Sequence, residues 1–232
     1  MKKHTKTIIA VIIGITILIG GVWMINESRY PNVPAFKDHF TRKFLNKDKK
    51  VDDGFYEFKS KTGQYTMWFP EEYQIIHKDA SDYVKDGTYY EFLKASNNSH
   101  DGYKGYIDIE LSEKKTNKEK IYVEGLFKKR FYINDPQKLQ TDTTRIYYDS
   151  AYIYFKGTDK RVIMDFNKRT PSTYVGYIAD KNSERVIEFY FDSTEHLSEK
   201  SAEKREEWII KILKVLLLKQ NKNKVYSFCF KQ

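Results

Sequence analysis

The distribution of hydrophobic and polar residues divides this chain into three parts. Residues 7–25 (TIIAVIIGITILIGGVWMI) contain no charged side chain. As a helix rising about 1.5 Å per residue, this run would cover about 28 Å, close to the thickness of a bilayer's hydrocarbon core. A mixed stretch follows, and from residue 53 onward polar and apolar residues alternate. The pattern predicts one transmembrane helix followed by a folded domain.

The apolar run could be a retained anchor or a signal peptide that is removed. Lys2, Lys3 and Lys6 precede it, as both kinds of segment require. A signal peptide, however, has about 7–15 apolar residues and then small residues at its cleavage site. Here the run is longer and continues into Trp23 and Met24. The sequence favours a retained anchor, with cleavage as the alternative.

The charges beside the run predict its orientation in the cell membrane. Three lysines precede it, whereas only Arg29 follows within ten residues, which favours an amino terminus inside the cell. Lys37, Arg42 and Lys43 lie a little further on, so a domain in the cytosol is the alternative. Trp23 suits the aromatic belt at the far interface. We expect residues 1–6 inside, 7–25 in the membrane and the domain outside.

Residues 26–52 are expected to form a juxtamembrane segment with a short amphipathic helix. Its phenylalanines recur every four residues, so they share one helix face, and lysines lie beside them. One interpretation is contact with an anionic membrane surface. The alternative is that the phenylalanine face packs on the chain's own domain. The candidate contact residues are Phe36, Phe40, Phe44, Lys37 and Lys43.

Alternating residues predict a series of strands in the domain that we assign to residues 53–219. In residues 103–111, for example, Ile107, Ile109 and Leu111 alternate with polar or amphipathic neighbours. Short polar turns join several of the strands, and such turns connect only antiparallel neighbours. The expected strands are residues 55–59, 64–69, 88–94, 103–111, 144–148, 151–156, 161–167, 172–179 and 185–191.

Two helices and a tail complete the expected domain. Residues 117–133 carry apolar side chains at steps of three and four, and residues 195–219 are acidic early and basic late, as a helix dipole favours. The tail, residues 220–232, is basic and could add an edge strand. The predicted fold class is therefore α+β, an antiparallel β-sheet flanked by helices behind one N-terminal transmembrane helix.

Composition limits the possible partners. The chain has 41 Lys and Arg against 32 Asp and Glu, a net charge of +9, to which the three lysines before the apolar run contribute. This excess is moderate, so nucleic acid is not an expected partner. The single cysteine, Cys229, can form no internal disulfide. An exported domain without disulfides, in a chain rich in Lys and Asn, suggests a Gram-positive bacterium.

Two segments resemble PsbP-like domains. Residues 64–70 (QYTMWFP), followed by Tyr73, are similar to that family's opening strand, which ends in an aromatic residue and proline. Residues 185–191, Ser193-Thr194 and residues 208–213 (WIIKIL) look like its closing strand and helix. The layout covers residues 55–219. The resemblance implies an antiparallel sheet flanked by helices and a mostly non-catalytic binding or assembly domain, although no lipid-anchoring cysteine follows the apolar run.

The sequence predicts no enzyme, cofactor or metal site. Ser-x-x-Lys spacings at Ser112 and Ser201 lack the companion motifs of penicillin-recognising enzymes in their usual order. The five histidines have no second His or Cys at ligand spacing. Asp108 and Glu110 share a strand face and could do acid–base work, but a solvated face is the favoured interpretation.

The clearest candidate contact surface is basic and surrounds the helix predicted over residues 117–133. It could meet an anionic envelope polymer, lipid headgroups or an acidic protein patch. The alternative is that these side chains are only the solvated face of an amphipathic helix. The candidate residues are Lys114, Lys115, Lys118, Lys128, Lys129 and Arg130.

Three functional hypotheses remain open. The first is a membrane-tethered, non-enzymatic extracytoplasmic domain that binds an envelope protein or an anionic polymer. The second is a subunit of a secretion or conjugation complex in the envelope. The third is a hydrolase of the wall or of lipid, which would require a deep pocket holding two close carboxylates.

Overall fold

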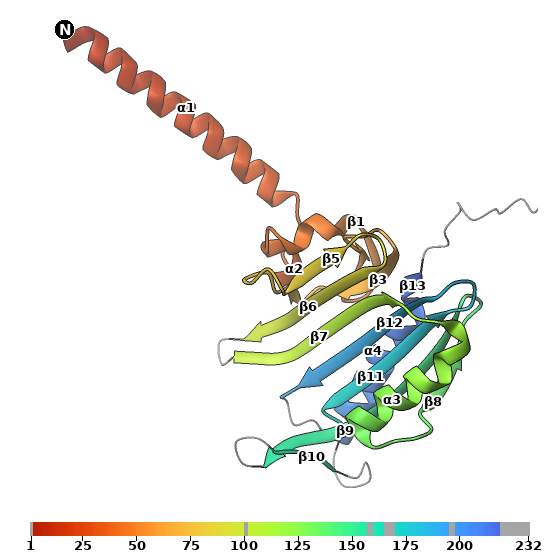
Figure 1. The fold of residues 1–232 in the computed structure, drawn as a ribbon. Coiled ribbons are helices and arrows are strands. Elements are labelled where there is room, and N and C mark those ends of the chain that lie inside the picture. The colour runs from red at the N-terminus through yellow and green to blue at the C-terminus, as the bar shows by residue number, and fades with distance from the viewer. Residues whose placement is uncertain (1, 100–101, 157–159, 165–169, 195–197, 219–232) are drawn as a thin grey trace, which may run out of the picture.

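The computed structural model describes residues 2–99, 102–156, 160–164, 170–194 and 198–218. Helix α1 (Lys2–Ser28) projects from a domain of two antiparallel sheets and flanking helices (Figure 1). Its window Val11–Ser28 is long and apolar enough to cross a membrane, and none of that window is buried against the domain. The expected α+β fold class behind one apolar helix is confirmed.

The juxtamembrane segment differs from the single amphipathic helix that the sequence predicts. It forms a short helix, α2 (Pro34–Lys37), a 3-10 turn, η1 (Thr41–Phe44), and then strand β1 (Leu45–Asp52). The Asp38 side chain accepts hydrogen bonds from the amide and hydroxyl of Thr41, with the amide nitrogen at 2.8 Å. Because such a local bond competes with a continuous helix, the chain turns at Asp38. Residues 45–52 are therefore part of a sheet rather than a linker.

The smaller sheet has the strand order β1-β2-β3-β13. It contains β2 (Phe55–Lys59), β3 (Tyr65–Pro70) and β13 (Leu217–Leu218). Strand β1 (LNKDKKVD) is its outer edge, where lysines discourage pairing with another chain. Strand β13 begins just beyond helix α4 (Glu199–Val215), so this helix ends earlier than residue 219. Residues 195–197 and the predicted tail strand lie outside the described residues.

The larger sheet has the order β10-β9-β11-β12-β7-β6-β4, with β5 paired to β6 and β8 paired to β9. Residues 144–156 form one strand, β9, rather than two, because Asp149 and Ser150 stay in register with β11. The strand bounds are β4 (Gln74–Ile75), β5 (Tyr83–Asp86), β6 (Tyr90–Ser99), β7 (Gly102–Glu113), β8 (Gln137–Gln140), β9 (Thr144–Lys156), β10 (Lys160–Met164), β11 (Thr173–Asp180) and β12 (Arg185–Ser193).

The helices cover opposite faces of the larger sheet (Figure 1). Helix α4 packs with the smaller sheet into the main core, where Gly176 of β11 makes room for Leu213. A Cβ at Gly176 would lie 2.7 Å from the Leu213 side chain, so a larger residue would push the helix or its side chain away. The turn η2 (Thr116–Lys118) leads into helix α3 (Glu119–Phe131), which packs on the other face through Val123, Phe127 and Phe131.

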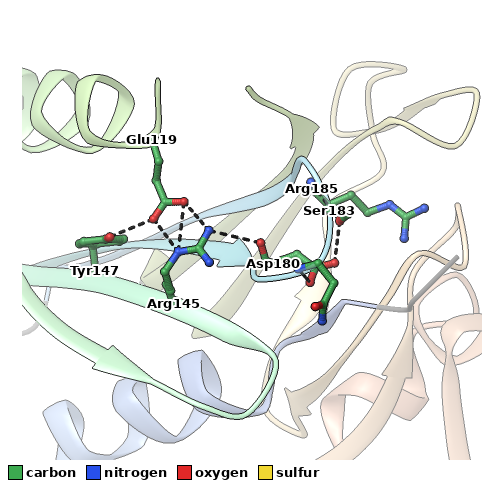
Figure 2. A network of polar contacts seen from close by, with 7 residues as sticks. Glu119, Arg145, Tyr147, Asp180, Ser183 and Arg185 are labelled. Atoms are coloured by element: carbon green, nitrogen blue, oxygen red, sulfur yellow. Dashed lines mark hydrogen bonds and ion pairs between the residues drawn. The ribbon is translucent and has the colours of Figure 1, made fainter. Parts of the chain in front are cut away.

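A polar network holds the start of α3 on that face (Figure 2). The Glu119 carboxylate accepts hydrogen bonds from Arg145 and from the Tyr147 hydroxyl, each at 2.9 Å to Oε1. The hydrogen bonds from Arg145 lower the pKa of Glu119, so the pair stays ionised at neutral pH. Arg145 also donates to the Asp180 carbonyl, which links the helix to the turn after β11.

Candidate functional site

A groove of about 810 Å³ lies at the end of the domain that adjoins α1. Tyr30, two residues after α1, forms part of its wall together with η1, the start of β1, and the turn between β2 and β3. Glu57 is the only carboxylate side chain among the lining residues. The lining cations are Arg42, Lys43, Lys47, Lys59 and Lys61.

A buried carboxylate fixes the turn that forms one side of the groove. Glu91 of β6 is 0% exposed, and its two oxygens accept hydrogen bonds from the amides of Lys61 and Thr62 at 2.8 and 2.7 Å. The Tyr83 hydroxyl donates a third at 2.8 Å. Burial, together with the Glu91 carboxylate, raises the pKa of Tyr83, which keeps this hydroxyl protonated as a donor. Gly63 supplies the left-handed conformation, φ +70°, that the turn needs.

A second set of contacts holds the groove against the end of α1. Arg42 forms a bidentate pair with Glu27, at 2.8 and 2.9 Å, and its guanidinium carbon lies 4.3 Å from the centre of the Tyr30 ring. Lys47 Nζ lies 5.2 Å from the same ring centre. The hydrogen bond from Arg42 lowers the pKa of Glu27. Tyr30 therefore contacts two cations, and the α1 end is fixed relative to the groove.

The four groove lysines form no ion pair in the described part of the chain, and the side chains of three of them, Lys43, Lys47 and Lys59, also donate no hydrogen bond there. Glu57 pairs with Lys49, outside the groove, and Lys61 donates to the Tyr83 carbonyl at 3.2 Å. Lys43, Lys47 and Lys59 form no ion pair with any carboxylate in the described part of the chain. Because these cations line one groove in which Glu57 is the only carboxylate side chain, the groove presents a positive potential suited to an anion.

A smaller cavity of about 240 Å³ lies where α4 passes the ends of β6, β7 and β12. Tyr73, Phe191 and Trp208 line it, and the Trp208 ring centre lies 6.0 Å from Tyr73 and 5.7 Å from Phe191. Glu72 is its one carboxylate side chain. Each of these two cavities thus holds a single carboxylate, whereas the hydrolase hypothesis requires two close together.

The phenylalanines predicted for the membrane surface pack within the domain. Phe36 is 1% exposed and makes an edge-on contact with Tyr56 at 4.8 Å between ring centres. Phe40 and Phe44 are half-buried against the main core. Phe36 therefore follows the alternative interpretation, in which the phenylalanine face packs on the chain's own domain. A buried ring cannot enter lipid without unfolding its surroundings. Lys37 and Lys43 are exposed, and their contact with a membrane surface stays a prediction.

The basic residues around α3 are not gathered on one surface. Lys114 pairs with Glu188, and the Arg130 guanidinium carbon lies 4.4 Å from the Tyr190 ring centre, so both side chains face the sheet. The exposed members lie at opposite ends of a 13-residue helix, about 20 Å long. They are Lys115, Lys118, Lys128 and Lys129. Their contact with an anionic partner stays a prediction. It would involve two separate surfaces, one at each end of α3.

Asp108 and Glu110 lie on one strand face, as predicted, but that face is not fully solvated. Register places Asp108 between Lys94 of β6 and Tyr190 of β12, and both carboxyl groups are half-buried. Asp108 Oδ1 is buried without a hydrogen-bond partner. Burial, with a smaller contribution from Asp192, raises the pKa of Asp108 to about 6. Burial also raises the pKa of Glu110.

Replacing Asp108 with asparagine should stabilise the domain above pH 6. The raised pKa means that the folded state disfavours the ionised carboxyl, so stability falls as pH rises from about 4 to 6 and then stays level. A shift of about two units corresponds to roughly 2–3 kcal/mol, which the amide would recover at pH 8. Urea unfolding at pH 4, 6 and 8 measures this difference. Glu113→Gln, exposed on the same strand, is the control. If the free energy of unfolding of D108N changed with pH in parallel with that of the wild type, the raised pKa of Asp108 would be contradicted.

Lys43 and Phe44 are the groove residues that the sequence predicted as contacts. Tyr30, Arg42, Lys47, Lys59 and Lys61 were not predicted, since they lie on separate elements with no common spacing. The only sequence signal was the concentration of lysines between residues 37 and 61. Among the described residues, no three His, Cys, Asp or Glu side chains are arranged to hold a metal ion.

Comparison with known proteins relates the domain, without α1, to one family. Residues 31–216 match the family model described as "Putative lipoprotein YvcA". A "Putative lipoprotein YvcA" of Bacillus subtilis (strain 168) is 23% identical over 162 residues, 69% of this chain and 65% of the relative. A crystal structure from Bacteroides thetaiotaomicron VPI-5482 at 1.50 Å resolution has a TM-score of 0.38 and 11% identity, covering 71% of this chain and 48% of that chain.

Proposed function

We propose that this chain, which belongs to the family described as "Putative lipoprotein YvcA", is a membrane-tethered, non-enzymatic domain that binds phosphate-bearing anionic components of the cell envelope. The single observation that carries this function is the groove beside α1. Its three unpaired lysines and single, externally paired carboxylate suit an anion. Anion binding needs only this fixed positive potential and no reacting group.

The tether in this proposal is α1, with the amino terminus inside the cell and the domain outside. The relative's printed name implies attachment to a membrane through lipid. The only cysteine in this chain is Cys229, far beyond the apolar run. No cysteine therefore stands directly behind the run to carry a lipid. The apolar length of α1 supports a retained span instead.

The PsbP-like resemblance is part of the same proposal. Strands β3 and β12 and helix α4 correspond to the segments that carry it, and the antiparallel sheet with flanking helices agrees with what it implies. A mostly non-catalytic binding family is consistent with a groove lined by cations. We assign no catalytic residue.

Replacing Lys43, Lys47 and Lys59 together with glutamine should weaken binding of poly(glycerol phosphate) by about tenfold or more. Each lysine near a dense anionic array contributes on the order of 1 kcal/mol, and these three have no carboxylate partner to retain them. Fluorescence anisotropy of the labelled polymer with the full chain in neutral detergent measures the change. The variant should still fold, since the side chains removed form no ion pair.

The matched control is Lys118, Lys128 and Lys129 replaced by glutamine, which removes equal charge from exposed positions around α3. This variant should bind within about twofold of wild type, since the charges lie outside the groove. Equal losses in both variants would indicate non-specific attraction to net charge. A loss confined to the α3 variant would move the binding surface to the residues predicted from sequence.

A further inference from the structure

We propose that the groove recognises the phosphate headgroup of an anionic phospholipid in the leaflet that holds the domain end of α1. This inference rests on the proposed function and identifies the ligand source. Lys43, Lys47 and Lys59 by themselves suit any phosphate-bearing anion. The position of the groove relative to the bilayer favours a lipid over the other phosphate-bearing anions.

The groove lies at the depth of the lipid headgroups. The apolar run ends at Ile25, and Tyr30 in the groove wall follows five residues later, about 7 Å along a helix axis. A bilayer is about 30 Å thick in its hydrocarbon core and about 40–45 Å with headgroups, which leaves about 5–8 Å for each headgroup layer. Trp23, 60% exposed near the end of the run, suits the same interface. The Tyr30 side of the groove therefore lies at headgroup depth.

Side-chain contacts hold the groove against the end of α1. The bidentate pair between Arg42 and Glu27 joins the groove directly to the last turn of α1. Tyr30 adds contacts with Arg42 and Lys47, and its ring centre lies 6.1 Å from that of Phe36 in α2. A flexible linker would leave the groove free to turn away from the membrane. Here the insertion of α1 itself fixes the height of the groove.

The lining of the groove combines cations with apolar side chains. Lys43 and Lys47 lie on elements that begin within twenty residues of the membrane span, and Lys59 lies across the groove on β2. Phe44 and Leu45, both half-buried, add apolar surface between these cations. A phospholipid presents the matching combination, a phosphodiester close to apolar acyl carbons. Soluble poly(glycerol phosphate) has the phosphodiester but no acyl chain.

The test uses the full chain in nanodiscs of phosphatidylcholine, with and without phosphatidylglycerol. Hydrogen exchange is followed at the turn between β2 and β3 and at η1. Phosphatidylglycerol should slow exchange severalfold at both segments in wild type. It should have no effect in the Lys43, Lys47 and Lys59 to glutamine variant, while the Lys118, Lys128 and Lys129 to glutamine control behaves as wild type.

A second variant tests depth separately from charge. A helical insertion of two turns, about seven uncharged residues between Ile25 and Asn26, moves the groove about 10 Å outward. It retains the contact of Glu27 with Arg42 and leaves every groove lysine in place. The response to phosphatidylglycerol should disappear in nanodiscs, whereas binding of soluble poly(glycerol phosphate) should remain at the wild-type level.

The outcomes separate this inference from the proposed function. Groove-dependent polymer binding without any response to phosphatidylglycerol would overturn the lipid inference and leave the proposed function standing. A lipid response that survives the lysine substitutions or the insertion would also overturn it. If the wild type neither bound the polymer nor responded to phosphatidylglycerol, the lipid inference and the proposed function would both be overturned.

Discussion

Replacing Glu91 with leucine should lower the free energy of unfolding by roughly 3–5 kcal/mol. The substitution leaves the amide of Thr62 and the hydroxyl of Tyr83 without their acceptor, while the amide of Lys61 keeps only the Tyr83 hydroxyl oxygen, at 2.9 Å. Each buried donor that loses its partner costs about 1–3 kcal/mol, partly offset because a buried carboxylate no longer needs to be desolvated. Urea unfolding of residues 26–232 at pH 7 measures the loss.

The same substitution should also weaken anion binding, since the turn that carries Lys59 and Lys61 loses its attachment to β6. Glu91→Gln is the matched control. It keeps one carbonyl acceptor but directs an NH₂ group at a backbone amide, so an intermediate loss of about 1–3 kcal/mol is expected. Wild-type stability in Glu91→Leu would mean that water or the tyrosines satisfy these amides. The buried carboxylate would then have no role in forming the groove.

Replacing Phe36 with serine should be similarly costly, about 4–5 kcal/mol, without changing lipid affinity in the molecules that remain folded. The ring is 1% exposed and packs edge-on against Tyr56, so its removal leaves a cavity. Serine also buries a hydroxyl in an apolar site. Urea unfolding and co-sedimentation of residues 26–232 with anionic vesicles give the two measurements.

Phe40→Ser and Phe44→Ser provide the comparison, because both rings are half-buried and should cost less, about 1–3 kcal/mol each. If Phe36→Ser instead kept its stability and lost vesicle binding, the sequence interpretation of this residue as a membrane contact would be right. The packing described for α2 would then be wrong.

Much of the fold followed from local pattern. The uncharged run 7–25 lies within one long helix, and the window Val11–Ser28 of that helix is long and apolar enough to cross a membrane. Residues 103–111 and 185–191 lie in strands β7 and β12, as their alternation predicts, and these two strands pair in the larger sheet. Both predicted helices formed, since the pattern places their apolar side chains on one face.

The predictions that differ from the structure do so for the same reason. Phe36, Phe40 and Phe44 have helical spacing, yet a bond from Thr41 to Asp38 divides the segment, and burial against β2 and the main core decides where the rings point. Strand β1 has no apolar alternation because, as an exposed edge, it buries little. In both cases contacts distant in sequence outweighed the local preference.

The sequence by itself determined the apolar helix, the antiparallel strands and the flanking helices, since each depends on the periodicity of neighbouring residues. Only the tertiary structure decided the groove. Tyr30, Lys43, Lys47 and Lys59 meet because two sheets and a buried Glu91 bring four elements together. The half-burial of Asp108 likewise depends on residues of β6, β12 and α3. Charge and pKa are set by surroundings in space, and those surroundings come from parts of the chain that no local pattern connects.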